Sequence, residues 1–188
     1  MRERSILFAR DMVLALRAGR KTQTRRLVSP PPDRFWQVDG ASLCLAAGQR
    51  ELSFPFGAVG DRLWVREKWG YLRQFMDRST PPGGEFVYGA DGPPAGALFA
   101  AWKPSLYMPR TACRMMLEVT GGRAERLQQI SPEDGRAEGC PPTLWDDPVA
   151  WFAEYWMHFS TARGGAWDAN PWVWVVNFKV VPTEAASF

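Results

Sequence analysis

The sequence predicts an α+β fold: a small, mainly antiparallel β-barrel with about three flanking helices. Short apolar segments typical of strands outnumber the amphipathic segments typical of helices. Gly and Pro clusters typical of turns separate these segments. The chain has 188 residues, of which 46% are hydrophobic and 23% charged, and this is the size and composition of one globular domain. We therefore expect residues 1–188 to form a single domain.

The first elements are a strand, a helix and a second strand. Residues 5–9 form a short apolar run typical of a strand, and Asp11 is placed to cap a helix that Gly19 ends. Residues 20–28 then alternate in a strand-like way until the Pro-rich break that follows.

Two long excursions interrupt the predicted barrel. Residues 29–56 are irregular and Gly-punctuated, with room for one short hairpin, and residues 70–111 bracket a strand over 85–90. Between the excursions, residues 57–61 form a turn and 62–69 a strand.

The C-terminal half adds strands and two helices. Residues 112–120 form a strand, the Gly121-Gly122 pair a turn, and residues 123–127 a continuation or a partner strand. A helix starts at Ser131, where Pro and two acidic residues follow the cap, and it ends at Gly139. Another begins at Asp147-Pro148, and residues 172–181 form the last strand.

Charge and cysteine usage narrow the class of protein. Residues 1–26 hold eight Lys and Arg against two acids, a local balance of +6, whereas the whole chain carries +3. This distribution is typical of a protein that binds a polyanion or a nucleotide. A basic surface that is merely exposed to solvent is an equally good interpretation. Three scattered cysteines and one histidine exclude zinc ribbons, Cys/His fingers and disulfide frameworks. We expect no metal, no cofactor, no membrane partner and a cytoplasmic location.

The segment Gly19-Arg-Lys-Thr-Gln-Thr-Arg-Arg26 contains nothing apolar and is the best candidate for chemistry. Lys21 leaves the helix in a turn and Thr24 lies on the following strand, so an amine and a hydroxyl can meet there. Neighbouring arginines push a lysine toward its neutral form, and burial acts in the same direction. A neutral lysine can take a proton from a threonine hydroxyl, which gives a nucleophile and a base without histidine.

This helix and its basic segment resemble the opening motif of the ASCH domains, small RNA-associated barrels related to the PUA fold. The resemblance continues through Gly60–Val65, Met116–Thr120, Ser131–Gly139 and Val173–Lys179. Short segments such as Trp102-Lys-Pro-Ser and Met108-Pro-Arg110 resemble segments of the longer ASCH proteins of bacteriophages and prophages. The resemblance covers nearly the whole chain outside the two excursions.

The resemblance implies an activity, because small bacterial ASCH enzymes hydrolyse the amide of N4-acetylcytidine with a Lys, a Thr and a Glu. Motif for motif, these fall on Lys21, Thr24 and Glu138. Thr24 would attack the acetyl carbonyl, Lys21 would activate it, and Glu138 would hold the lysine or handle the proton on the leaving amine. Backbone amides near Thr24, or the Arg26 guanidinium, would serve the oxyanion.

Further substrate contacts are expected from the basic segment, the central strand and the second excursion: Arg20, Arg26, Glu67, Trp69, Tyr88, Lys103 and Arg110. Glu67 is expected to accept from a cytosine-like amine or, more ordinarily, to pair with an arginine of residues 20–26. Lys103 and Arg110 are candidates for contacts with phosphate, and they are equally well interpreted as solvent-exposed cations in a loop. Trp69, Tyr88 and Trp167 are candidates for base stacking, and His158, with no partner for a triad or metal site, is taken as structural.

Two other functions remain open. The same pocket would serve a non-catalytic module that binds RNA or a modified base. It would also serve a metal-independent ribonuclease, in which lysine and threonine act on a phosphodiester. Turnover of N4-acetylcytidine without added metal distinguishes the amidohydrolase from both.

Overall fold

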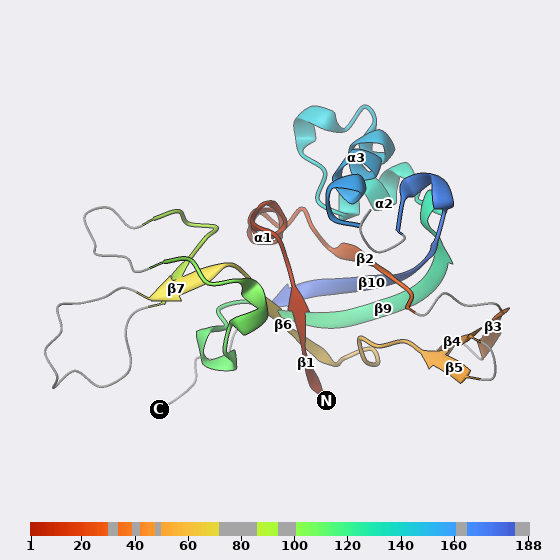
Figure 1. The fold of residues 1–188 in the computed structure, drawn as a ribbon, viewed down its shortest axis with the longest axis horizontal. Coiled ribbons are helices and arrows are strands. Elements are labelled where there is room, and N and C mark those ends of the chain that lie inside the picture. The colour runs from red at the N-terminus through yellow and green to blue at the C-terminus, as the bar shows by residue number, and fades with distance from the viewer. Residues whose placement is uncertain are drawn as a thin grey trace, which may run out of the picture.

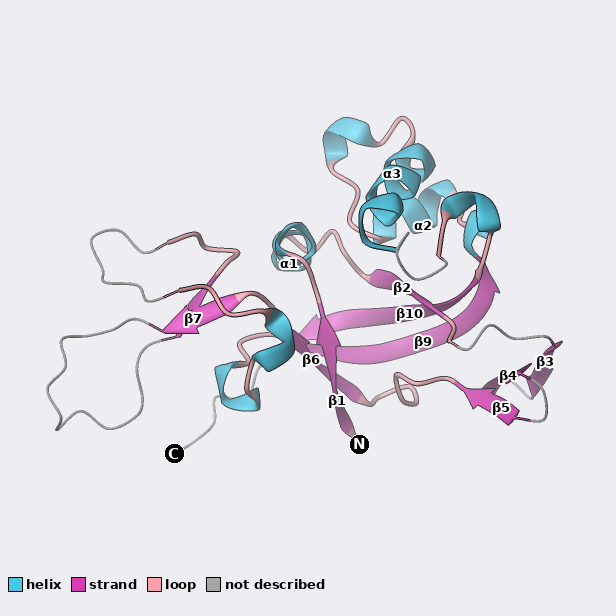
Figure 2. Ribbon diagram, viewed as in Figure 1, coloured by secondary structure: helices cyan, strands magenta, loops and turns pink. Residues whose placement is uncertain are grey.

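The computed structural model describes residues 1–29, 34–38, 42–47, 50–71, 86–93, 101–160 and 165–182. Its centre is a five-stranded mixed sheet with helices above it (Figures 1 and 2). The strands, in order across the sheet, are β1 (Glu3–Leu7), β6 (Arg62–Arg66), β9 (Met116–Arg126), β10 (Trp172–Val181) and β2 (Gln23–Leu27). The α+β class predicted from the sequence is confirmed.

The sheet is open, so the prediction of a closed barrel is wrong. β1 and β2 lie at opposite edges, and β1 runs parallel to β6 while the other neighbours are antiparallel. Because β1 and β2 follow each other in the chain, α1 (Arg10–Arg17) crosses the sheet between them (Figure 1). The sequence pattern shows that strands exist, but it does not show whether the two edge strands pair.

Two smaller sheets lie in the segments predicted as excursions. β3 (Arg34–Val38), β4 (Ser42–Ala47) and β5 (Arg50–Ser53) form an antiparallel unit, which is more than the one hairpin expected. β7 (Trp69–Tyr71) pairs with β8 (Phe86–Tyr88). Residues 72–85 and 94–100 of the second excursion lie outside the described residues.

Capping residues fix two of the three described α-helices as predicted. α2 (Pro132–Ala137) is capped by Ser131, whose Oγ accepts from the Asp134 N–H at 3.1 Å. α3 (Pro148–Ser160) follows Asp147, whose carboxylate accepts from the Ala150 N–H at 2.9 Å. α1 has Ala9 at its N-cap and no side-chain cap, so the predicted cap at Asp11 is wrong. Short 3-10 turns are η1 (Ser105–Tyr107), η2 (Arg110–Ala112), η3 (Leu127–Gln129), η4 (Pro142–Leu144) and η6 (Trp167–Ala169).

The predicted turn at Gly121-Gly122 is instead the middle of one long, curved strand, β9, as the alternative of a continuation anticipated (Figure 1). A Cβ on Gly122 would lie 2.4 Å from the Phe54 ring, so this glycine makes room for an aromatic side chain. The pairing of β9 with β10 shifts register between Asn177 and Phe178. Such a bulge bends a strand locally.

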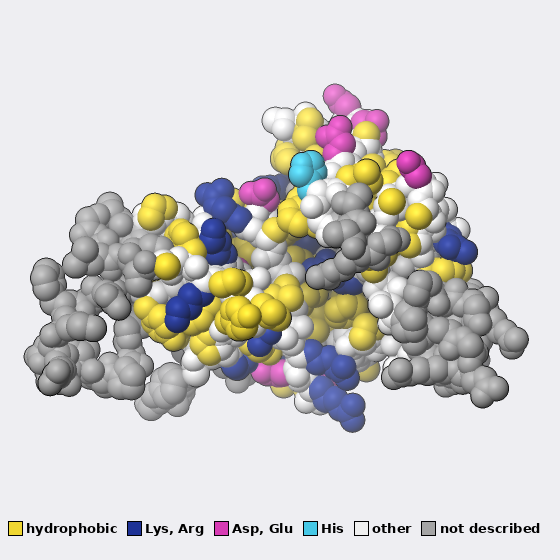
Figure 3. Space-filling view, viewed as in Figure 1, with side chains coloured by type: hydrophobic (Ala, Val, Ile, Leu, Met, Phe, Trp, Pro, Cys, Tyr) yellow, Lys and Arg dark blue, Asp and Glu magenta, His cyan; other side chains and the backbone are white. Residues whose placement is uncertain are grey.

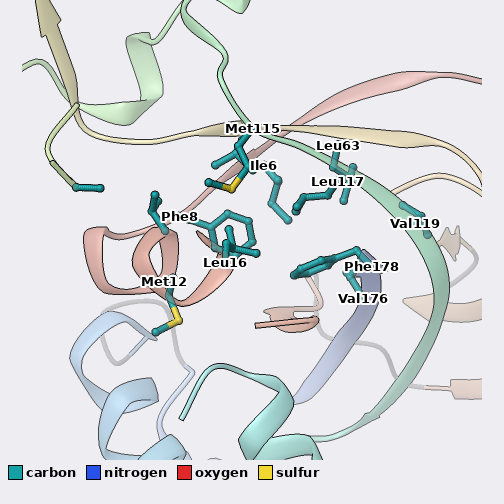
Figure 4. Packing of buried hydrophobic residues seen from close by; sticks show 13 residues of the cluster. Ile6, Phe8, Met12, Leu16, Leu63, Met115, Leu117, Val119, Val176 and Phe178 are labelled. Carbon is teal, nitrogen blue, oxygen red and sulfur yellow. The ribbon is translucent and has the colours of Figure 1, made fainter. Parts of the chain in front are cut away.

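Two apolar clusters hold the helices onto the sheet. Phe8 and Leu16 pack between α1 and the strands, Met12 belongs to the same cluster, and the ring centroids of Phe8 and Phe178 are 6.2 Å apart (Figure 4). A second cluster joins Phe152 and Trp156 of α3 to the sheet; its other buried members are Leu127, Ile130, Val173 and Val175. None of the helices described is long and apolar enough to cross a membrane.

Candidate active site

A cavity of about 740 Å³ lies where β2 passes between the start of α1 and α3. Its wall includes Phe8 and Met12 on one side and aromatic residues of α3, such as Tyr155 and Phe159, on the other. Of the ten residues predicted for the site, it is lined by Lys21, Thr24, Arg26 and Glu138. A volume of this size is typical of small-molecule pockets.

The backbone places Lys21 at this wall by ending α1 sharply. Gly19 has φ +69°, the left-handed conformation that glycine adopts without a Cβ penalty. The N–H groups of Arg20 and Lys21 both donate to the Ala15 carbonyl, at 3.0 and 3.2 Å. Lys21 therefore turns back toward the helix immediately before β2 begins.

Glu138 reaches the same point from the end of α2. The Thr22 N–H donates to the Ala137 carbonyl at 2.9 Å, which ties the end of α2 to the start of β2. Gly139 follows with φ +105°, and a Cβ there would lie 2.9 Å from the Cβ of Ala15. A glycine at this position thus lets α2 approach α1 closely enough for Glu138 to meet Lys21.

Lys21 and Glu138 form a buried ion pair. The Lys21 Nζ donates to Glu138 Oε2 and to the Glu138 carbonyl, both at 2.7 Å, and the two residues are 2% and 3% exposed. Burial lowers the pKa of Lys21 to about 8, against the opposing effect of the Glu138 carboxylate. Arg26 and Arg25 lower it further by charge repulsion. The expectation that Lys21 is pushed toward its neutral form therefore agrees with the geometry.

Arg25 holds Glu138 from behind. Its side chain is fully buried and contacts Glu138 Oε1 at 3.1 Å, Asp134 at 2.8 Å and Glu125 at 2.5 Å. Arg123 bridges the last two carboxylates, at 2.7 and 2.6 Å. Sequence reasoning missed Arg25 as a site residue, although it lies inside the basic motif, because nothing in the sequence placed three distant acids around it.

Thr24 and Arg26 lie on the same side of β2, because residues two apart in a strand share a face. The Thr24 side chain is buried, and its Oγ1 accepts from the Arg26 guanidinium at 2.5 Å. Arg26 also donates to the Leu7 carbonyl at 2.8 Å and stacks on Phe8, 5.2 Å from the ring centre. The hydroxyl is thus held by a cation at the cavity wall.

The arrangement leaves Lys21 able to act as a base. A neutral amine has two N–H donors and one lone pair, and both donors are used by Glu138. Loss of the third proton therefore breaks neither hydrogen bond to Glu138, and the lone pair is left for a proton from another group.

The structure does not bring the other predicted substrate contacts to the cavity. Glu67 is buried and accepts from Arg114 Nε at 2.8 Å and from Nη2 at 2.9 Å, so the expected partner within residues 20–26 is wrong. Tyr88 lies under the same Arg114 guanidinium, 3.8 Å from it, and its hydroxyl donates to the Ala112 carbonyl. Because β6 leads away from β2 across the sheet, these side chains belong to a separate cluster.

Trp69, Lys103, Arg110 and Arg20 also lie away from the cavity wall. Trp69 is buried among aromatic residues, and the Lys103 amine stands 5.0 Å above its ring. Arg110 pairs with Glu3 at 3.0 Å, and the buried Arg20 Nε has no hydrogen-bond partner among the described residues.

The α3 wall was not predicted as part of the site. Phe152 and Trp156 pack in the core and also line the cavity. Burial raises the pKa of Tyr155, another wall residue, to about 12. No group of three or more potential metal-ligating side chains occurs in the described part of the chain.

Comparison with known proteins gives two solved structures. No family model matches the chain, and no curated protein matches it. A protein from Enterococcus faecalis described by the family model DUF984 is similar with a TM-score of 0.48 at 10% identity, over 97% of this chain and 82% of that one. An ASCH domain from Lactobacillus crispatus is similar with a TM-score of 0.47 at 16% identity, over 97% of this chain and 81% of that one.

Proposed function

We propose that this protein is an ASCH-type amidohydrolase that removes the acyl group from N4-acetylcytidine-type nucleosides. The observation that carries the proposal is that the buried Lys21–Glu138 ion pair and the buried Thr24 line the same cavity. The motif resemblance supplies the substrate. The cavity supplies room for a flat ring between Phe8 and the aromatic residues of α3.

In the first half-reaction, the Thr24 Oγ attacks the acyl carbonyl while its proton passes to the neutral Lys21 amine. The C–N bond of the tetrahedral intermediate then breaks, and the Lys21 ammonium returns the proton to the leaving N4 amine. The products are cytidine and an acyl ester on Thr24. A water molecule, deprotonated by Lys21, attacks that ester, and its proton passes to the departing Thr24 oxygen.

Arg26 and Glu138 support these steps. The Arg26 guanidinium donates to Thr24 Oγ1, so its positive charge lies near the acyl group that this oxygen attacks, and it favours the negative charge that develops on the acyl oxygen in both intermediates. Glu138 keeps Lys21 in position and compensates the ammonium when the proton is held.

The test is conversion of N4-acetylcytidine to cytidine by the purified protein without added metal, followed by chromatography. Thr24→Val and Lys21→Met should each lower kcat to background, because one removes the nucleophile and the other the base. Thr22→Val is the matched control: its side chain is exposed on the same segment and it should keep full activity. Absence of turnover by the folded wild-type protein contradicts the proposal.

A non-catalytic module that binds a modified base is the second candidate. It is favoured by the near-complete burial of Thr24, whose oxygen already accepts a hydrogen bond from Arg26. A protein that never cleaves the amide, but retains RNA with an affinity that falls steeply with salt, would fit this candidate.

A further inference from the structure

The charges around the cavity do not balance. Its lining includes four cationic side chains, Lys21, Arg25, Arg26 and Arg126, against a single carboxylate, Glu138. Lys21 and Arg25 are neutralised by ion pairs with acids. Within the part of the chain that the structure describes, Arg26 and Arg126 form no ion pair with a carboxylate. The cavity therefore carries an excess of positive charge, which favours an anionic occupant.

The two unpaired cations differ in what they are free to do. Arg26 already donates to Thr24 Oγ1 and to the carbonyls of Arg25 and Leu7, so its guanidinium is committed to the catalytic end of the cavity. Arg126 is exposed, and among the residues that the structure describes its side chain donates one hydrogen bond, to the Asn170 carbonyl at 3.2 Å. Most of the five N–H donors of Arg126 remain available to a ligand.

Arg126 is held in place by its surroundings. Its guanidinium lies 4.8 Å from the centre of the Trp172 ring, the residue opposite it in the β9–β10 pair. The adjoining loop is pinned to η3, because the Gln128 N–H donates to Asn170 Oδ1 and the Leu127 N–H to the Pro171 carbonyl, both at 2.9 Å. A guanidinium stacked on a ring and fixed at one nitrogen is already oriented for a ligand at its other edge.

The spacing between the two ends of the cavity suits a nucleotide. The Val28 N–H donates to the Trp172 carbonyl at 3.0 Å, so the Arg126–Trp172 pair lies beside the end of β2. Thr24 and Val28 are four residues apart, a separation of about 13 Å along an extended strand. The substrate ring would extend toward Thr24 at one end, and the Arg126 side chain extends toward the cavity at the other. Between them, a separation of this length matches a pyrimidine with its sugar and phosphate.

We propose that Arg126 forms a phosphate subsite at the end of the cavity remote from Thr24, so that the preferred substrate is a phosphorylated N4-acylcytidine rather than the free nucleoside. The proposal rests on the proposed function for the identity of the base. The phosphate is either the monoester of a free nucleotide or the diester of an RNA chain, since both present the same anionic oxygens to a guanidinium.

The experiment compares kcat/KM for N4-acetylcytidine, its 5′-monophosphate and a short oligoribonucleotide that carries the same base. In the wild type, phosphate should raise kcat/KM about tenfold or more, the value of one hydrogen bond to a charged group. Arg126→Ala should abolish this gain, so that the phosphorylated and unphosphorylated substrates react with equal kcat/KM. Arg136→Ala, a half-exposed arginine away from the cavity, should keep it. A gain with the monophosphate identifies a nucleotide substrate, and a gain with the oligonucleotide alone identifies RNA.

Equal kcat/KM for all three substrates, or a gain that survives Arg126→Ala, overturns the subsite and leaves the amidohydrolase intact. Binding of cytidine and of cytidine 5′-monophosphate, measured by calorimetry, separates the two proposals. If no substrate is cleaved but the monophosphate binds more tightly than the nucleoside, and only when Arg126 is present, the subsite stands while the amidohydrolase fails. If cytidine and its monophosphate bind equally, the subsite is wrong whatever the activity.

Discussion

Lys21 is 2% exposed, so its ammonium form has lost the water that would otherwise solvate it. The Glu138 carboxylate recovers part of this cost, and the remainder appears as a pKa lowered to about 8. A base works best when its pKa lies near the operating pH. The burial that makes Lys21 costly to protonate would therefore also suit it to the proposed role of a base.

The pH dependence of turnover follows from this pKa. Because Lys21 must be neutral to accept the Thr24 proton, kcat/KM should rise about tenfold per pH unit below pH 8 and level off above it. Initial rates between pH 5.5 and 9.5, in buffers of constant ionic strength, give the profile. A profile that is flat from about pH 6 to 9 would exclude Lys21 as the base.

Arg25 should be the most costly cation to remove. Arg25→Met leaves three acids without their shared partner, and loss of one member of a buried ion-pair network costs about 3–5 kcal/mol of unfolding free energy. Arg123→Met is the matched control, because it touches Glu125 and Asp134 but is 37% exposed, and it should cost about 1 kcal/mol or less. Urea unfolding measures both.

The pH profile of turnover is an independent test that compares the Arg25 and Arg123 variants. Arg25 variants should shift the profile, since Arg25 contacts the Glu138 carboxylate that binds Lys21, and Arg123→Met should not. If the two variants lose equal amounts of stability, Arg25 is no more important to the buried network than Arg123.

Among the elements, the junction of α1, β2 and α2 determines the site. α2 is only six residues long and is not itself stable in isolation, so its position depends on its caps and contacts. Ser131 fixes where it begins, and the close contact of Gly139 with Ala15 fixes where it ends. Glu138, at the C-cap, is consequently placed by the ends of the helix more than by the helix itself.

Gly139→Ala tests this role of the junction. The substitution forces a Cβ into the φ +105° conformation and within 2.9 Å of Ala15, so it should destabilise the protein by about 1–3 kcal/mol and lower kcat by displacing Glu138. Gly19→Ala is the control: it also has a positive φ, but its Cβ would meet nothing within 4 Å. If the two alanines cost the same stability and activity, the close approach of α2 to α1 is unimportant.

Local signals in the sequence predict the helices and strands well, because caps, breakers and periodicity are local properties. The start of α2 at Ser131, the start of α3 after Asp147 and the whole of β10 agree with expectation. Gly122 was misread because a glycine that makes room for Phe54 looks the same in sequence as one that forms a turn. The parallel pairing of β1 with β6 was missed, because it joins segments more than fifty residues apart.

The same limit applies to the site. Lys21 and Thr24 share a motif, and the meeting of Lys21 with Glu138 was expected from a resemblance rather than from spacing. The Arg25 network and the Arg126–Trp172 pair could not be predicted, because each joins residues that are distant in sequence. Side chains that the sequence grouped by chemistry, such as Glu67 and Trp69, belong instead to a separate cluster around β6 and β7.

At the scale of the whole molecule, charges of opposite sign are separated on the face that Figure 3 shows. Asp and Glu gather mainly at the top of this view, over α3 and the segment before it, while Lys and Arg lie mostly below. An anion approaching this face would meet repulsion at the acidic region and attraction at the basic one. Raising the ionic strength should weaken this effect.

The stability of the whole protein should pass through a maximum in alkaline solution, because the buried Lys21 and the partly buried Tyr155 titrate there with opposite effects on stability. The pKa of Lys21 is about 8 in the folded protein and 10.5 for a free lysine side chain, so between these values the unfolded chain binds more protons and stability rises with pH. The penalty removed is at most about 3 kcal/mol. Burial raises the pKa of Tyr155 from 10.0 to about 12, so between these the folded protein binds more protons and stability falls.

Urea unfolding from pH 7 to 11 should show the rise in the wild type and not in Lys21→Met, in which Glu138 keeps Arg25 as its partner. Tyr155→Phe should delay the fall, and a rise that persists in Lys21→Met would show that another group causes it.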